Sequence, residues 1–188
     1  MEDIIKYTCS CCGKIHEEWP SLAFDSPTGY NVLPESVKLE IGELTSDFCI
    51  IRHVEQTDRY IRATLTQKVI DHCQGLEYGL WVSLSEKNFQ DYSDNYDNAN
   101  HTTQYFAWLS NNIPEYDIIK DLPTTVFTKL GNQRPEIVPH KDFDHPFVRD
   151  YYNGITKVEA ENRIRDMLKA IEERDTVKDS TKAWWKFW

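Results

Sequence analysis

Apolar and polar residues alternate along much of this chain, a pattern typical of β-strands. Residues 48–54 and 59–66 are rich in β-branched and aromatic residues, and the polar break between them predicts a hairpin. In the second run Tyr60 lies on one side while Arg59 and Ile61 lie on the other, so we expect one face of the sheet to be exposed to solvent. Further strands are predicted over 77–84, 105–109, 122–129 and 136–138.

Helical periodicity is clearest near the C-terminus. Thr156 and Glu159 have the spacing of a capping box, in which each side chain satisfies the other residue's free N–H. Ser85 is expected to cap a shorter helix, and Pro34 suits the first turn of another. Behind the capping box, apolar residues recur at helical spacing to about residue 173, at Val158, Ile164, Met167, Leu168 and Ile171.

Strands that follow one another, with a long helix at the end, predict an α+β fold: an antiparallel sheet with helices packed on it. Residues 1–20 are expected to form a zinc-knuckle-like hairpin packed on a main domain of residues 21–174. Residues 175–188 are interpreted as a polar linker and an aromatic tail. Four aromatic residues with apolar neighbours are predicted to lie in the core: Trp81, Phe89, Phe106 and Trp108.

The formal net charge of −10 changes the range of expected partners. Nucleic acids and anionic membranes attract Lys and Arg, so both are disfavoured. A basic protein partner is compatible with this charge, although the charge also serves solubility alone. No apolar run approaches the roughly 18 residues of a membrane span, and the first residues lack the pattern of a signal peptide. We therefore expect a soluble cytoplasmic protein without a transmembrane segment.

A cluster of cysteines near the N-terminus is the most informative chemical feature. Three of the five cysteines lie within residues 9–12, where disulfides between them would be cramped, so a metal site in a reducing cytoplasm is favoured. Cys9 and Cys12 are spaced so that one tight turn aims both sulfurs inward, and Gly13 suits the exit of that turn. His16 is close enough in sequence to reach the same ion.

A structural zinc site needs a fourth ligand, since such sites fill all four tetrahedral positions. Cys49 is the first candidate, and the weaker candidates are His72, Cys73, His140 and His145. Two other interpretations stay open. One is a reduced knuckle of small buried residues. The other is a redox pair, although the strand-then-helix context of thioredoxin-like sites is missing.

These features predict a non-enzymatic binding module with a structural zinc site, and no catalytic residue is assigned. The alternative is a zinc-dependent hydrolase with an open metal position, which requires a nearby acid or base such as Asp144 or His145. The tail is a second candidate contact surface, because four large aromatic residues interleave with lysines near the chain end. These residues, predicted to bind this domain, a partner or a membrane interface, are Trp184, Trp185, Phe187 and Trp188.

Several segments, taken in order, resemble the bacterial family named domain of unknown function 2199. They begin with Tyr7-Thr-Cys-Ser-Cys-Cys-Gly-Lys-Ile-His16 and Ser46-Asp-Phe-Cys49, and they continue at 79–89, 108–116, 134–137 and 144–147. The resemblance covers roughly residues 6–171, and Trp-Val-Ser-Leu-Ser at 81–85 is its most specific piece. It implies a bacterial cytoplasmic protein that starts with Cys-x-x-Cys-Gly-x-x-His, and it carries no established activity. Cys11 departs from that pattern.

Overall fold

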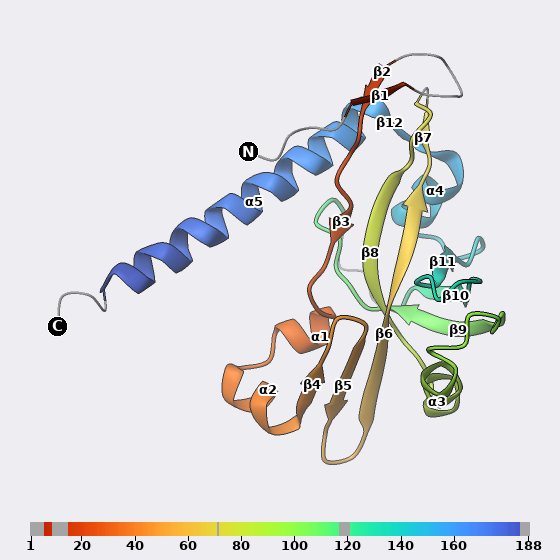
Figure 1. Ribbon diagram of the computed structural model, residues 1–188, viewed down its shortest axis with the longest axis vertical. Coiled ribbons are helices and arrows are strands. Elements are labelled where there is room, and N and C mark those ends of the chain that lie inside the picture. The colour runs from red at the N-terminus through yellow and green to blue at the C-terminus, as the bar shows by residue number, and fades with distance from the viewer. Residues whose placement is uncertain (1–5, 9–14, 71, 117–120, 185–188) are drawn as a thin grey trace.

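The computed structural model describes residues 6–8, 15–70, 72–116 and 121–184. Within these ranges the chain is a mixture of helices and strands, as the sequence predicts (Figure 1). The helices are α1 (Thr28–Asn31), α2 (Glu35–Ile41), α3 (Glu86–Asp94), α4 (Pro146–Asn153) and α5 (Lys157–Trp184). The strands of the main sheet are β3 (Leu22–Ala23), β4 (Gly42–Leu44), β5 (Phe48–Arg52), β6 (Thr57–Gln67), β8 (Leu76–Ser83), β9 (Gln104–Leu109), β10 (Pro123–Phe127) and β11 (Glu136–Pro139).

The main sheet closes on itself into a five-stranded barrel. Its order is β3-β8-β9-β10-β11-β6-β5-β4, and an additional pairing of β8 with β6 completes the ring β6-β8-β9-β10-β11. Most neighbours are antiparallel, but β11 runs parallel to β6 and β3 runs parallel to β8. The expected antiparallel sheet is therefore refined to a mixed barrel. The long strand β6 makes this possible because β5, β8 and β11 all pair with it.

Alternate residues of the barrel strands face inward and form the core. Within β6, for example, Ile61, Ala63 and Leu65 are all completely buried. Strand alternation places every second side chain on one face, which fills the barrel with side chains from all five strands. The other main-core residues in the ring include Leu76, Tyr78, Leu80, Val82, Tyr105, Ala107, Leu109, Val126 and Ile137.

Local signals in the sequence define most of the remaining elements correctly. The predicted hairpin is β5 and β6, with Phe48 paired to Ile61. Ser85 caps α3 by accepting a hydrogen bond from the Asn88 N–H at 3.3 Å. Thr156 accepts one from the Glu159 N–H at 3.2 Å at the start of α5. Among the described residues, no helix is long and apolar enough to cross a membrane.

The C-terminal helix α5 is longer than the periodicity predicts. Apolar spacing ends near residue 173, whereas the helix continues to Trp184. Its first half packs on the barrel through Ala160 and Ile164, and its second half extends away from the rest of the molecule (Figure 1). Residues 175–184, interpreted from the sequence as a linker, are therefore helical.

The prediction that four aromatic residues lie in the core is correct for two of them. Trp81 and Phe89 are buried, but Phe106 is 46% exposed and Trp108 is 42% exposed. Both lie in β9, where Tyr105, Ala107 and Leu109 alternate with them and face the core instead. Because β9 is apolar on both faces, its neighbours in sequence could not show which face is buried.

Candidate functional site

The two arms around the cysteine cluster pair as a hairpin. Strand β1 (Lys6–Thr8) is antiparallel to β2 (Ile15–Glu17), with Tyr7 opposite His16 and Thr8 opposite Ile15. Cys9 and Cys12 lie outside the described residues, between these strands. Nearby, the rings of Trp19 and His72 stack with centroids 4.3 Å apart, which joins the chain after β2 to the segment after β7 (Val69–Ile70).

Cys49, the first candidate for a fourth zinc ligand, lies in β5. Figure 1 shows β5 near α2, at the opposite end of the molecule from the β1–β2 hairpin. The Cys49 side chain is completely buried in a cluster with Ile51, Tyr60 and Trp81. Burial, followed by the negative charge of Asp58, raises the pKa of this thiol to about 12. The structure thus brings Cys49 into an apolar cluster and does not bring it near His16.

The weaker ligand candidates are dispersed as well. His140 contacts the Thr125 hydroxyl at 3.0 Å, and His145 caps α4 by accepting a hydrogen bond from the Phe147 N–H at 3.1 Å. Asp144 pairs with Arg149 at 2.8 Å. Over the part of the chain that the structure describes, no three His, Cys, Asp or Glu side chains are grouped to hold a metal ion. Cys9 and Cys12 do not belong to that part of the chain.

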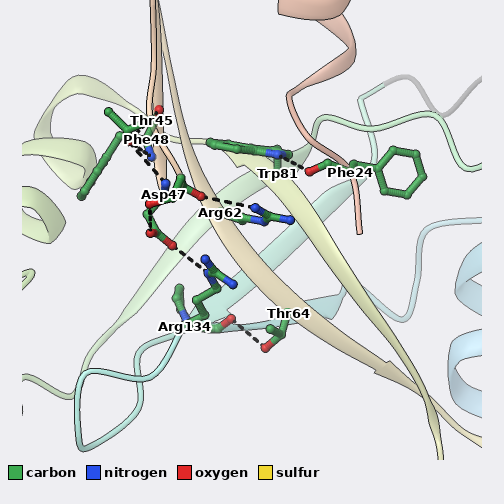
Figure 2. A network of polar contacts seen from close by, with 10 residues as sticks. Phe24, Thr45, Asp47, Phe48, Arg62, Thr64, Trp81 and Arg134 are labelled. Carbon is green, nitrogen blue, oxygen red and sulfur yellow. Dashed lines mark hydrogen bonds and ion pairs between the residues drawn. The ribbon is translucent and has the colours of Figure 1, made fainter. Parts of the chain in front are cut away.

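The segments that carry the family resemblance meet in a polar network beside β6 (Figure 2). Arg134 donates a hydrogen bond to Asp47 at 2.7 Å, and Trp81 donates through its indole N–H to the Phe24 carbonyl at 2.9 Å. Partial burial alone would raise the pKa of Asp47, but hydrogen bonds from Arg134 and Ser46 outweigh it and hold the pKa below 3.8. This network fastens the loop before β5 to the loop before β11.

A cavity of about 400 Å³ lies between the β3 segment and α5. One wall is the continuous stretch Leu22–Ser26, and the opposite wall is the face of α5 that carries Arg163, Asp166, Met167 and Ala170. Segments that are far apart in the sequence therefore form the two walls of this cavity. The remaining lining residues, from α1, β8 and the loop after β9, are Asn31, Tyr78, Ile113, Pro114 and Glu115. We call this site the β3–α5 pocket.

The polar wall of the pocket is a buried arginine. Arg163 is only 2% exposed, donates to the Tyr78 hydroxyl at 3.0 Å and pairs with Glu159 and Asp150. Burial alone would lower the pKa of this guanidinium, but its bonds to Tyr78 and Glu159 keep the pKa above its ordinary value, so it stays charged. Burial raises the pKa of Tyr78 to about 12 and keeps it neutral. Among the residues that the structure describes, none is a hydrogen-bond partner of the Arg163 Nε atom.

The charges around the pocket are mostly negative. Two carboxylates, Glu159 and Asp150, already face the single guanidinium of Arg163. Three exposed carboxylates also line the rim, those of Asp25, Glu115 and Asp166. An apolar wall with an acidic rim is suited to a ligand that is part apolar and part cationic.

The patterns in the sequence do not predict this pocket, although they contain one signal for it. Arg163 lies on the same helical face as Ala160 and Met167, inside the stripe that packs on the barrel. A cation in a core-facing stripe needs partners, and its position next to apolar residues was the sign of a buried network. The predicted tail residues are different: Trp184 ends α5, and Trp185, Phe187 and Trp188 lie outside the described residues.

The fold and the site together define a mixed α+β protein built on a small barrel. Its pocket has an acidic rim and lies at the edge of the main sheet. The chain belongs to the family DUF2199, described as an uncharacterised protein conserved in bacteria, whose model matches residues 8–155. No curated protein and no solved structure matches the chain. The match includes most of the pocket wall but ends before Arg163.

Proposed function

We propose that this protein is a non-enzymatic interaction module that binds a basic segment of another protein in the β3–α5 pocket. The observation that supports this most directly is the combination of apolar wall and acidic rim at one cavity of about 400 Å³. Leu22, Phe24 and Met167 offer apolar contact, while Glu115 and Asp166 attract positive charge. The overall charge of −10 adds long-range attraction for the same partner.

The proposal is tested with a labelled peptide of alternating lysine and valine, compared with its glutamate–valine counterpart by fluorescence anisotropy. We expect that only the lysine peptide binds. Its affinity should fall as the salt concentration rises, because salt screens exposed charges. The double variant Glu115→Gln/Asp166→Asn should weaken binding about tenfold, equivalent to about 1.4 kcal/mol.

A matched control separates local from overall charge. The variant Glu40→Gln/Glu55→Gln removes two exposed carboxylates from α2 and the β5–β6 turn, so its net charge equals that of the pocket variant. It should bind the lysine peptide nearly as well as the natural protein. Equal loss in both double variants, or equal binding of both peptides, would count against a specific acidic site.

We also propose a structural zinc ion at the N-terminal hairpin, held by Cys9, Cys12 and His16 in a reducing cytoplasm. The support is the ligand spacing together with the antiparallel pairing of β1 and β2 on both sides of the cysteines. His72 stacks on Trp19, which follows β2, so His72 and its neighbour Cys73 are the better located candidates for a fourth ligand. Cys49 lies at the far end of the molecule. A closed site of this kind would stabilise the fold and leave no open position for hydrolysis.

A further inference from the structure

We infer that the basic segment binds as an added β-strand along the free edge of β3. This inference rests on the proposed function, because it specifies how the same pocket receives its partner. Strand β3 is the outermost strand of the main sheet and pairs only with β8 among the strands that the structure describes. An edge strand presents unpaired backbone groups to any extended chain beside it.

The backbone bonds of the β3 segment show which groups face outward. Phe24 donates its N–H to the Gly79 carbonyl at 2.9 Å and accepts from the Trp81 indole, so its backbone groups face β8. Ser26, two residues further, accepts from the Asn111 side chain at 2.9 Å. Successive residues of a strand direct their backbone groups to opposite sides, so those of Ala23, the residue before Phe24, face away from β8.

Ala23 is exposed, and its N–H and C=O make no hydrogen bond that the described structure shows beyond the β3–β8 pairing. It therefore offers one donor and one acceptor at the edge that borders the pocket. The pocket begins at this edge, since five successive residues from Leu22 to Ser26 line it. A peptide strand beside Ala23 would lie between β3 and α5.

The side chains of such a strand would meet two different surroundings. Every second side chain points to the same face of a strand, so one set would enter the apolar wall around Phe24 and Met167. Basic side chains near the rim would reach Glu115 and Asp166. The partner class that fits is an extended segment in which apolar and basic residues alternate, which is the pattern of the lysine–valine probe.

The test compares two N-methylated isomers of the lysine–valine peptide. One isomer carries its methyl groups on the backbone nitrogens of the valines, and the other carries them on the backbone nitrogens of the lysines. Only one set of amides faces β3 in a given register, so methylation of that set removes the donors and blocks the approach of the backbone. We expect one isomer to lose at least about tenfold in affinity, and the other to bind nearly as tightly as the unmethylated peptide.

A protein variant tests the same edge from the other side. Ala23→Pro removes the outward N–H and leaves the bonds of Phe24 to β8, because proline is tolerated on edge strands. It should weaken the peptide about tenfold with an unchanged melting temperature, and Ser21→Pro, before the strand, should not. If both isomers and Ala23→Pro bind normally while Glu115→Gln/Asp166→Asn does not, strand addition is wrong and the acidic pocket stands. If the unmethylated peptide itself fails to bind, both proposals fall.

Discussion

At the scale of single residues, Arg163 connects several elements around the pocket. Its guanidinium joins α5 to β8 through Tyr78 and to α4 through Asp150, and its centre lies 4.9 Å from the Tyr116 ring. Tyr116 in turn donates to Asp150 at 2.7 Å. The capping box at the start of α5 is only half formed for the same reason, because the Glu159 carboxylate pairs with Arg163.

Replacing this arginine should therefore destabilise the whole fold. Arg163→Met leaves the buried Tyr78 hydroxyl and the partly exposed carboxylates of Asp150 and Glu159 without their cation. Leaving one buried polar group without its partner costs about 1–3 kcal/mol. The measurement is the free energy of unfolding in urea. Arg165→Met is the matched control, since Arg165 is exposed and bonds only Asn162 among the described residues, and it should change stability by less than about 0.5 kcal/mol. Similar values for both variants would show that the network contributes little.

At the scale of elements, the sequence predicted what local patterns encode and missed what long-range pairing decides. The hairpin of β5 and β6, the Ser85 cap and the start of α5 all depend on nearby residues, and all three are confirmed. The barrel depends on the parallel pairing of Glu136 with Thr64, which joins strands far apart in sequence. No periodicity within either strand carries that information.

The candidate site also combines features that the sequence predicts with features that depend on long-range packing. The acidic balance and the cysteine spacing are properties of the sequence, but the pocket forms only because α5 returns beside β3, the first strand of the barrel sheet. Phe106 and Trp108 illustrate the limit most clearly, since an apolar strand can bury either face until its neighbours are known.

The N-terminal hairpin carries the element-scale prediction. Untagged protein from zinc-supplemented growth should contain about one zinc per chain by elemental analysis, and Cys9→Ser/Cys12→Ser should contain none and melt at a lower temperature because structural zinc contributes folding energy. Cys49→Ala should keep its zinc, whereas Cys73→Ala tests the nearer fourth ligand. Metal-free natural protein with an unchanged melting temperature would end the zinc proposal.

At the scale of the whole molecule, the architecture separates three regions with different tasks. The barrel core holds the fold together, and the hairpin of β1 and β2 lies at one end of the molecule (Figure 1). The pocket lies between the edge strand β3 and the first half of α5, and its acidic rim is exposed. The second half of α5 extends beyond this pocket and away from the barrel as far as Trp184 (Figure 1).

The most direct test of the pocket as the binding surface is an NMR titration of isotope-labelled protein with the lysine–valine peptide. The largest amide shift changes are expected at Ala23, Phe24 and Met167, with smaller changes near Glu115. The exposed aromatic face of β9 at Phe106 and Trp108, which a nonspecific apolar peptide would also contact, should change little. If the largest shifts occur on that face, or around Cys49 at the far end of the molecule, the β3–α5 pocket is not the binding surface.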